Sequence, residues 1–267
     1  MSNIQAAIFD VDGTLFDYHD MKIHDSTVEA IHRLKEQGTT IIVASGRSYP
    51  LLGVECLNKS PADYYVTANG HSIQDSHANE LFAQRFTFEQ TELVVELTKK
   101  YGNGLLLKYA DYSYLYSKPD EMFQVFNNIG LCRDMFRTCT SMDHHYTELP
   151  IGFTIRGGDE IKNELAAIQQ DYRVELFHDI TECDVFSPKM NKMTALQKLA
   201  DMLNLNPHDC VAFGDSRNDI EMVQWAGLGV AMGNACKDLK DVADTVCACS
   251  WEDGIAKTVT TLLKTVS

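Results

Sequence analysis

Continuous runs of apolar residues recur along the first part of the chain. They end at Phe9, at Ala44 and at Ala68, and a polar residue follows each of them at once. Runs without polar alternation are typical of parallel strands that are buried on both faces of a sheet. The pattern therefore predicts three parallel strands within the first eighty residues.

Helical patterns separate these runs. Ser26, with Glu29 three residues later, predicts a capping box at the start of a helix, and Gly38 marks its end. The last third of the chain repeats the alternation of strand and helix. Its predicted elements are a helix over 193–203, a strand over 211–213, a helix over 219–226, a strand over 229–232 and a helix over 255–263.

The middle of the chain has a different pattern. Thr87 with Gln90 predicts another capping box, and the elements that follow carry apolar faces of their own. They are strands over 105–107, 112–116, 151–156 and 174–177 and helices over 122–129 and 161–168. We predict an α+β unit over residues 83–186, inserted into an outer α/β domain formed by residues 1–82 and 187–267.

Two groups of side chains in this insert raise the question of ligand binding. His144 and His145 lie in a polar stretch and are expected in a loop. Four tyrosines recur along one predicted strand and are interpreted as one packed face, with a substrate pocket as the alternative. These are Tyr109, Tyr112, Tyr114 and Tyr116.

Four strands of the outer domain end in polar residues. Because the carboxyl ends of parallel strands share one edge of a sheet, these residues are expected to converge on one crevice. Lys192, at the start of a helix after the insert, can join them. The four groups are Asp10 with Asp12, Ser45-Gly46-Arg47, Asn69-Gly70, and Gly214-Asp215-Ser216-Arg217-Asn218-Asp219.

These residue types favour phosphate chemistry with a metal ion. The carboxylates of Asp10, Asp12 and Asp215 are hard oxygen donors of the kind that Mg²⁺ prefers. Ser45 offers a hydroxyl group, the neighbouring glycines offer backbone N–H groups, and Lys192 adds a positive charge suited to phosphate oxygens. Asp10 and Asp12 could serve as a nucleophile and an acid. A simple turn of the chain after Asp12 is the alternative for that segment.

Charge and cysteine usage argue against several classes of protein. The chain has 38 acidic and 23 basic residues and a formal net charge of −15, which disfavours a broad surface for nucleic acid or for an anionic membrane. Eight cysteines without a CxxC spacing disfavour a structural zinc site and a disulfide framework. No secretory signal and no apolar segment of membrane-spanning length is visible, so a cytoplasmic protein is expected.

Four motifs, in this order, resemble the signature of the haloacid dehalogenase (HAD) phosphohydrolase superfamily. The resemblance covers essentially the whole chain and implies a doubly wound parallel-sheet (Rossmann-like) α/β core. The insert resembles the α+β cap domain of the Cof-like branch, which determines substrate specificity. The motifs are Asp10-x-Asp12-Gly13-Thr14-Leu15, Ser45-Gly46-Arg47, Lys192, and Gly214-Asp215-x-x-Asn218-Asp219.

The resemblance implies a catalytic role for five of these residues. Asp10 would attack phosphorus and form an aspartyl-phosphate, which splits one difficult step into two easier ones. Asp12 would protonate the departing alkoxide and then activate the water that hydrolyses the intermediate. Mg²⁺ would be held by the Asp10 carboxylate, the Asp12 backbone carbonyl and Asp215. Ser45 and Lys192 would bind the phosphoryl oxygens.

The resemblance also implies roles for the neighbouring residues. Asn218 and Asp219 would orient the site. From their positions at the strand ends, Gly46, Arg47, Asn69 and Asn218 are also expected to contact the phosphoryl group or the substrate. Arg47 has an alternative, which is an ion pair with an internal carboxylate. Asp219 has two alternatives, a helix-start acid and a direct metal ligand.

The implied function is that of a Mg²⁺-dependent phosphomonoesterase acting on a small phosphorylated metabolite. Sugar phosphates are the first substrate class, followed by flavin-pathway and pyridoxal-type phosphates. The alternatives are a phosphotransferase or phosphomutase on the same site, a non-catalytic phospho-accepting switch, and a dehalogenase. Lys189 is a competitor for the role of Lys192, and Ser45 could merely end its strand. Nothing in the sequence predicts the oligomeric state.

Overall fold

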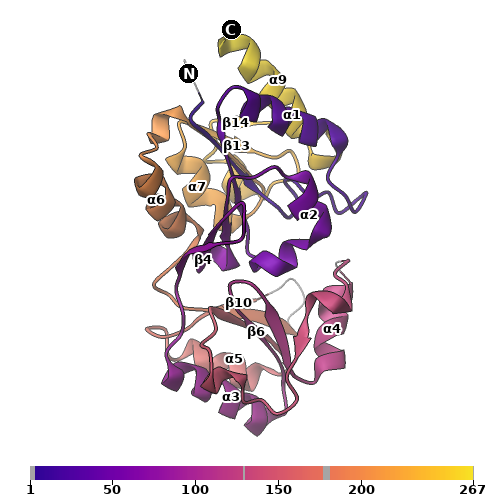
Figure 1. The fold of residues 1–267 in the computed structure, drawn as a ribbon, viewed down its shortest axis with the longest axis vertical. Helices are drawn as coiled ribbons and strands as arrows, with labels where there is room; N and C mark the ends of the chain where they lie inside the picture. Colours follow the sequence, from indigo (N-terminus) through magenta and orange to yellow (C-terminus); the bar gives the residue numbers. More distant parts are fainter. Residues whose placement is uncertain (1–3, 129, 177–180, 267) are drawn as a thin grey trace.

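The computed structural model describes residues 4–128, 130–176 and 181–266 of the chain. These residues form two parts, each built around one β-sheet, and Figure 1 shows one part above the other. We call the part with the eight-stranded sheet the core and the part with the six-stranded sheet the cap. The expected Rossmann-like core with an inserted cap is confirmed.

The core sheet has the strand order β14-β13-β12-β1-β2-β3-β4-β5. The first six strands in this order are parallel, and β4 and β5 extend the sheet as an antiparallel hairpin that the sequence patterns do not predict. The strands are β1 (Ala6–Asp10), β2 (Thr40–Ala44), β3 (Tyr64–Thr67), β4 (Ser72–Asp75), β5 (Glu80–Ala83), β12 (Cys210–Gly214), β13 (Leu228–Ala231) and β14 (Thr245–Val246).

Both faces of the core sheet are buried under helices. Ala7 and Phe9 of β1 belong to an apolar cluster shared with α1 and α9, whereas Ala6 and Ile8 belong to a second cluster shared with α6 and α7. Burial on both faces explains why no polar residue interrupts this strand. The helices are α1 (Asp25–Glu36), α2 (Gly53–Lys59), α6 (Lys192–Leu203), α7 (Ile220–Trp225), α8 (Lys237–Lys240) and α9 (Gly254–Val266).

The start of α1 differs from the prediction. The helix begins at Asp25, directly after His24, so the capping box predicted for Ser26 and Glu29 is wrong. The Ser26 hydroxyl group instead donates a hydrogen bond to Asp253, the residue that precedes α9. The Ser26 side chain therefore bonds to a residue far along the chain instead of capping the N-terminus of its own helix.

The cap sheet has the strand order β10-β11-β9-β6-β7-β8. One of its faces packs against α3 and α5 in an apolar cluster that includes Tyr109, Tyr112 and Tyr116, so these tyrosines form a packed face, as predicted. The elements are α3 (Phe88–Tyr101), β6 (Gly104–Lys108), β7 (Ser113–Ser117), α4 (Pro119–Asn127), β8 (Arg137–Thr138), β9 (Gly152–Arg156), α5 (Asp159–Ala166), β10 (Arg173–Leu176) and β11 (Glu182–Phe186).

Two other features of the cap sequence are visible in the structure. The capping box of Thr87 and Gln90 at the start of α3 is confirmed. His144 and His145 begin a short 3-10 turn within the predicted loop, and the buried His145 ring lies 2.6 Å from a carboxylate oxygen of Glu92. This histidine is therefore used in cap packing.

The chain passes from the core to the cap after β5 and returns to the core after β11. The division at residues 82/83 and 186/187 stays a prediction. The predicted helix end at 129 and the predicted strand end at 177 lie outside the described residues. Among the helices of the described ranges, none is both long enough and apolar enough to cross a membrane.

The turn after β3 packs against the start of α6. Ala68 and Asn69 both have a φ of 49°, and Gly70 follows with a φ of 89°. A Cβ atom on Gly70 would lie 1.9 Å from the backbone oxygen of Asn191, the residue before α6. Glycine is therefore required at this position, and its close approach brings the end of β3 next to Lys192.

Gly70→Ala should destabilise the protein more than Gly38→Ala. Both glycines have a positive φ, but a Cβ atom on Gly38 would meet nothing within 4 Å. We expect a cost of about 1–2 kcal/mol at Gly38 from the left-handed backbone alone. At Gly70 we expect roughly 3 kcal/mol or more, because the backbone of Asn191 must also move. Urea unfolding of both variants measures the difference, and equal midpoints would contradict the requirement at Gly70.

Candidate active site

The polar ends of four strands meet at one edge of the core sheet. Strands β12, β1, β2 and β3 are adjacent and parallel, so their carboxyl ends lie side by side. Asp10 ends β1, Asp215 follows β12, Ser45 and Gly46 follow β2, and Asn69 follows β3. This is the edge at which open α/β sheets bind ligands.

Lys192 lies buried between two carboxylates. Its Nζ donates to Oδ1 of Asp10 at 2.7 Å and to Oδ1 of Asp219 at 2.6 Å, and all three side chains are buried. Burial alone would lower the pKa of Lys192, but the charges of Asp10 and Asp219 outweigh it and raise the pKa above its ordinary value. The competitor Lys189 is exposed. The ammonium group of Lys192 is therefore firmly held in its charged form.

Asp219 connects this lysine to the loop after β12. Its Oδ1 accepts from Lys192, and its Oδ2 accepts from the backbone N–H groups of Asp215 at 3.1 Å and Ser216 at 3.0 Å. Both carboxylate oxygens thus have partners within the protein. These contacts favour a supporting role for Asp219 over direct metal ligation, and that role stays a prediction.

Around Asp10 the negative charge of three carboxylates, those of Asp10, Asp215 and Asp219, exceeds the positive charge of Lys192. Burial raises the pKa of both Asp10 and Asp215, and the negative charge of Asp219 raises them further; that of Asp215 reaches about 7. Oxygens of Asp10, Asp215 and Asp219 lie within 4.8 Å of one another. Within the described part of the chain, the buried Oδ1 of Asp215 has no hydrogen-bond partner. Such a group favours the binding of a cation.

Asp12 is held apart from the other acids. Its carboxylate accepts from Nη2 of Arg47 at 2.6 Å and from Nε at 3.1 Å, and the Tyr18 hydroxyl group also donates to it. Arg47 therefore forms the internal ion pair that was one of its two alternatives. Tyr18 is not among the predicted site residues, because nothing in its local sequence pattern distinguishes it from a surface tyrosine.

The turn after Asp12 needs a glycine. Gly13 has a φ of 81°, and a Cβ atom there would lie 2.3 Å from Oδ2 of Asp215. The side-chain amide of Asn234 donates to the Gly13 carbonyl oxygen at 2.8 Å and accepts from the Ser250 N–H group at 3.1 Å. The loops after β1 and β12 can therefore approach each other closely, and Asn234 fixes the first of them.

The other predicted residues form a polar chain that reaches the cap. Ser45 is buried, and its Oγ accepts from the backbone N–H group of Arg47 at 3.0 Å. Asn218 donates through Nδ2 to Oδ1 of Asn69 at 3.0 Å, and Asn69 donates through Nδ2 to Oε2 of Glu175 at 2.7 Å. Glu175 belongs to β10 of the cap. Glu175 is not among the predicted site residues, because its contact with Asn69 joins residues that are far apart in the chain.

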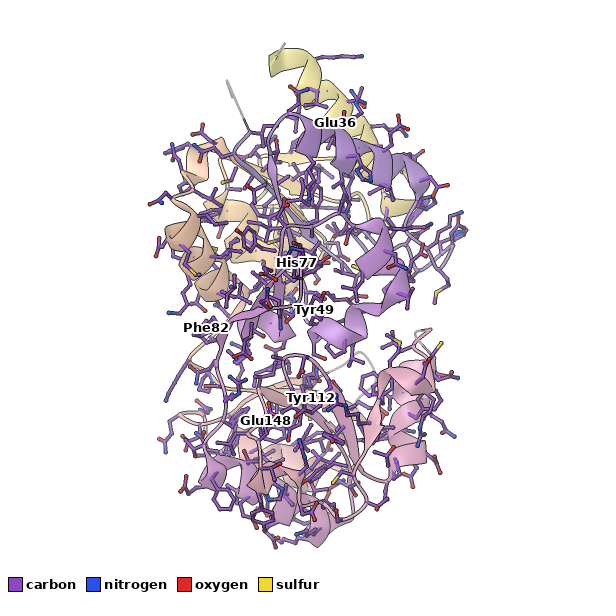
Figure 2. The ribbon with its side chains drawn as sticks, in the orientation of Figure 1. Glu36, Tyr49, His77, Phe82, Tyr112 and Glu148 are labelled. Carbon is purple, nitrogen blue, oxygen red and sulfur yellow. The ribbon has the colours of Figure 1, made fainter. Side chains whose placement is uncertain are left out.

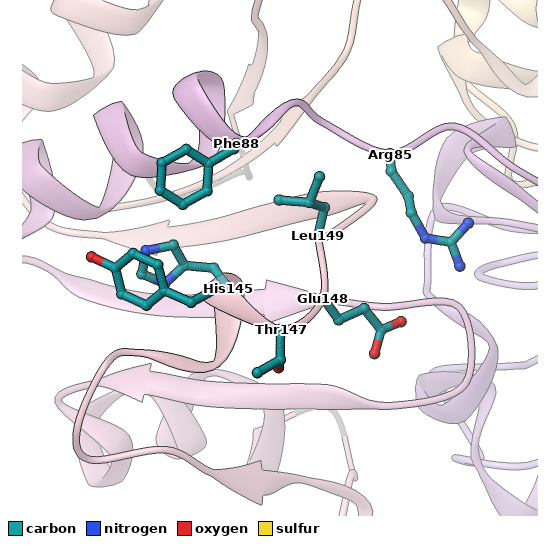
Figure 3. Close-up of a pocket in the computed structure, with 7 residues that line it drawn as sticks. Arg85, Phe88, His145, Thr147, Glu148 and Leu149 are labelled. Atoms are coloured by element: carbon teal, nitrogen blue, oxygen red, sulfur yellow. The ribbon is translucent and has the colours of Figure 1, made fainter.

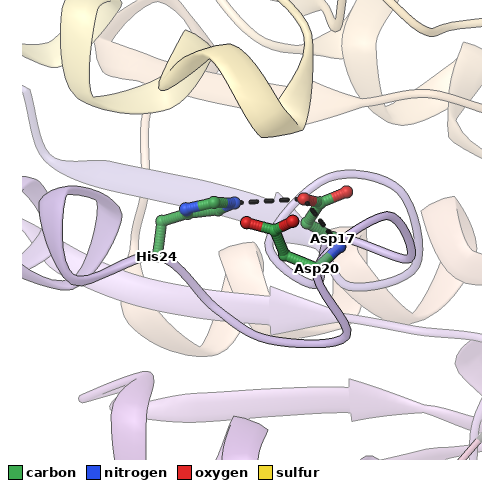
Figure 4. A group of neighbouring side chains, drawn as sticks. All are labelled: Asp17, Asp20 and His24. Atoms are coloured by element: carbon green, nitrogen blue, oxygen red, sulfur yellow. Dashed lines mark hydrogen bonds and ion pairs between the residues drawn. The ribbon is translucent and has the colours of Figure 1, made fainter.

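A second group of metal-ligating residue types lies in the loop before α1 (Figure 4). The buried carboxylate of Asp17 accepts from the backbone N–H groups of His19 and Asp20, and His24 contacts it through Nε2 at 3.1 Å. These protein contacts lower the pKa of Asp17 against the effect of burial. The group is a satisfied turn and provides no argument for a metal ion.

The cap contains a hollow of about 490 Å³ beside α3 (Figure 3). None of the predicted site residues lines it. Figure 2 shows Glu148 and Tyr112 near each other in the cap, and the Tyr112 hydroxyl group donates to Glu148. The lining residues are Arg85, Phe88, His145, Tyr146, Thr147, Glu148 and Leu149.

The fold is that of an α/β protein with charged and polar side chains gathered at the carboxyl edge of its parallel strands. The profile of the haloacid dehalogenase-like hydrolase family matches residues 7–259. The chain therefore belongs to the haloacid dehalogenase-like hydrolases. The resemblance to the Cof-like branch is confirmed as well.

Named relatives are phosphatases. A 5-amino-6-(5-phospho-D-ribitylamino)uracil phosphatase of Bacillus subtilis is 27% identical over 259 residues, covering 96% of this chain and 95% of the relative. An HMP-PP phosphatase of Yersinia pestis is 30% identical over 247 residues, covering 88% and 85%. A solved HAD superfamily phosphatase from Bacteroides thetaiotaomicron shares the fold, with a TM-score of 0.82, 21% identity and coverage of 97% and 95%. The expected phosphatase class is confirmed.

Replacing Lys192 with methionine should destabilise the protein strongly. The substitution leaves Asp10 and Asp219 buried without their cation, at a cost of about 3–5 kcal/mol. Lys189→Met is the matched control, because Lys189 is exposed, and its change should stay within about 0.5 kcal/mol. Urea unfolding at pH 7 measures both. Equal stability of the two variants would show that the buried carboxylates do not depend on Lys192.

Asp215→Asn should stabilise the metal-free protein above neutral pH. The folded pKa of about 7 exceeds the unfolded value of about 3.9, so ionised Asp215 destabilises the fold increasingly as the pH rises from about 4 to 7. In the presence of a chelator, we expect a Tm several degrees above wild type at pH 8 and a difference that shrinks towards pH 4. The exposed-charge control, Glu29→Gln, should show no such trend. A difference independent of pH would contradict the raised pKa.

Proposed function

We propose that this protein is a Mg²⁺-dependent phosphomonoester hydrolase that forms an aspartyl-phosphate at Asp10. Its substrate would be a small phosphorylated metabolite, with sugar phosphates as the first class. The observation that carries the proposal is the buried ammonium group of Lys192, 2.7 Å from the Asp10 carboxylate. It sets a positive charge suited to phosphate oxygens beside a group suited to attack phosphorus.

The acidic group beside Lys192 fits a divalent cation. The buried Oδ1 of Asp215 has no hydrogen-bond partner among the described residues, and the pKa values of Asp10 and Asp215 are both raised. Carboxylates in this condition suit a hard cation such as Mg²⁺. Asp10 and Asp215 would hold it through their side chains, and Asp12 through its backbone carbonyl group. When bound, the ion would supply positive charge to the phosphoryl oxygens.

Asp10 would act as the nucleophile, with Lys192 fixing its orientation. Lys192 is itself anchored by Asp219, so the Asp10 carboxylate is held by a buried cation that is fixed in place. An oriented nucleophile loses little further freedom on reaching the transition state. The P–O bond to the leaving alkoxide breaks as the bond from Asp10 to phosphorus forms, and water later releases phosphate.

Asp12 would act first as an acid and then as a base. It would give a proton to the leaving alkoxide and take one from the attacking water. Because Arg47 and Tyr18 now hold its carboxylate, Asp12 must exchange these partners for the leaving oxygen. The exchange would free Arg47 to contact the substrate. Arg47 would then form the internal ion pair before substrate binds and the substrate contact afterwards.

The relatives extend the candidate substrates. One named relative acts on a compound with a phosphorylated ribityl chain, which is a polyol phosphate ester. The other is named for HMP-PP. We therefore propose phosphate esters of sugars and polyols first, with heterocyclic phosphates next. The cap would close over the crevice, select the leaving group and exclude water.

Asp10→Asn should abolish Mg²⁺-dependent phosphate release. An amide cannot attack phosphorus as a carboxylate does, so we expect a loss of roughly 1,000-fold or more in kcat. The assay is a screen of sugar, polyol, nucleotide and pyridoxal-type phosphates, with Mg²⁺ and with chelator. Unchanged circular dichroism of the variant serves as the folding control. Turnover retained by Asp10→Asn would overturn the assignment of the nucleophile.

The same assay separates hydrolysis from phosphoryl transfer. A hydrolase delivers phosphate to water, so free phosphate should equal the ester consumed even when sugars are added. A phosphotransferase or phosphomutase would instead yield a new ester and less free phosphate. Transfer that exceeds release at millimolar acceptor would replace the hydrolase proposal with its alternative.

A further inference from the structure

We propose that Glu175 of the cap is a positioning residue for the catalytic centre of the core, anchored by Arg173. The pair would fasten the cap over the crevice and hold the side-chain amides of Asn69 and Asn218 in place. The link between cap and core through Glu175 and Arg173, which we call the fastening, follows from contacts between the two parts of the molecule. Its effect on catalysis rests on the proposed function.

The two oxygens of the Glu175 carboxylate have different partners. Oε2 accepts from Nδ2 of Asn69 at 2.7 Å, and Oε1 accepts from Nε of Arg173 at 2.7 Å. Arg173 in turn donates from Nη1 to the backbone oxygen of Met190 at 2.7 Å. Strand β10 of the cap is thus tied to the core at two points, one after β3 and one just before α6. Both points adjoin predicted site residues.

The contact with Asn69 extends into the site. Asn69 is buried with a φ of 49°, and its Oδ1 accepts from Nδ2 of Asn218 at 3.0 Å. Asparagine adopts this left-handed conformation more readily than most other residues, so hydrogen bonds rather than backbone strain fix its side-chain amide. Glu175 supplies one of the two hydrogen bonds that fix the side-chain amide. A loss of Glu175 would therefore release Asn69 and, through it, Asn218.

The charges around Glu175 argue against a role in stability alone. Partial burial raises the pKa of Glu175, and the carboxylate of Asp184, opposite Glu175 in the sheet, raises it further, while Arg173 and Lys108 lower it in part. Asp184 is occupied by Lys108, whose Nζ lies 2.6 Å from Oδ2. A partly exposed ion pair such as that of Glu175 with Arg173 contributes little net stability. The hydrogen bonds of Glu175 to Asn69 and Arg173 explain a glutamate at this position better than a contribution to stability does.

Three variants test the fastening without any assay of activity. Glu175→Ala removes both contacts, Arg173→Ala removes the link to Met190, and Glu175→Gln keeps an acceptor for Asn69. Glu164→Ala is the matched control, because Glu164 lies on α5, on the far side of the cap sheet from the core (Figure 1), and pairs with Lys100. Small-angle X-ray scattering of the intact protein should show a larger radius of gyration for both alanine variants of the pair. Glu164→Ala should scatter as wild type does.

Hydrogen exchange tests the positioning of the amides. In Glu175→Ala, peptides that cover residues 68–72 and 214–219 should exchange faster than in wild type. Glu175→Gln should restore most of the protection, because its side-chain oxygen can still accept from Asn69. A merely structural role in cap packing would instead change peptides of β10 and β11 and leave the two core segments unchanged.

Kinetics test the catalytic consequence. On the best ester of the metabolite screen, Glu175→Ala should lower kcat by about 10- to 100-fold, as expected for a displaced site. KM should change less, and Glu175→Gln should recover most of kcat. If wild type hydrolyses no ester, the proposed function fails while scattering and exchange still decide the fastening. The proposal would be overturned if Glu175→Ala had the same radius of gyration and the same hydrogen exchange as Glu164→Ala. It would also be overturned if Glu175→Ala had a larger radius of gyration but the kcat of wild type.

Discussion

The buried ammonium group of Lys192 is the interaction on which the rest of this structure depends. It contacts Asp10 and Asp219 at hydrogen-bond distance, in a place where three carboxylates lie within 4.8 Å of one another. Without a cation between them, such acids would repel each other or take up protons. The strand ends β1 and β12 and the start of α6 can share one edge because this charge lies between them. The close approach of Gly70 to the residue before Lys192 serves the same contact.

Much of the site could be predicted from the sequence, because its residues follow a simple rule of topology. Asp10, Ser45 and Asn69 each follow a continuous apolar run, and such runs become neighbouring parallel strands whose carboxyl ends coincide. Asp215 follows β12, in the last third of the chain, in the same way, and Lys192 joins these residues from the start of a helix. This rule does not predict which hydrogen-bond or ion-pair partner each side chain has. Arg47 had two alternatives in the sequence, and the structure shows it paired with an acid.

The features that escaped prediction depend on contacts between distant segments. Tyr18 reaches Asp12 through the fold of its own loop, and Glu175 reaches Asn69 from the other sheet; no local pattern encodes either contact. The predicted capping box at Ser26 is wrong for a related reason, because the Ser26 hydroxyl group donates to Asp253, next to α9. In the hairpin, β5 is the partly exposed edge strand, whereas β4 is buried but contains the polar residues Ser72 and Gln74, so the apolar signal of both strands is weak.

If the proposed site binds substrate, the charge pairs imply that binding would exchange one set of ion-pair partners for another. Lys192 and Arg47 are the cations nearest the candidate nucleophile and acid, and both are already paired with carboxylates. An incoming phosphate must therefore compete with protein acids in a chain whose net charge is −15. Competition of this kind gains little from the two cations alone, because each new contact replaces an existing one. A divalent cation beside Asp10 and Asp215 would add positive charge that is not already neutralised. Affinity for phosphate esters should thus depend more steeply on the metal than on either basic side chain.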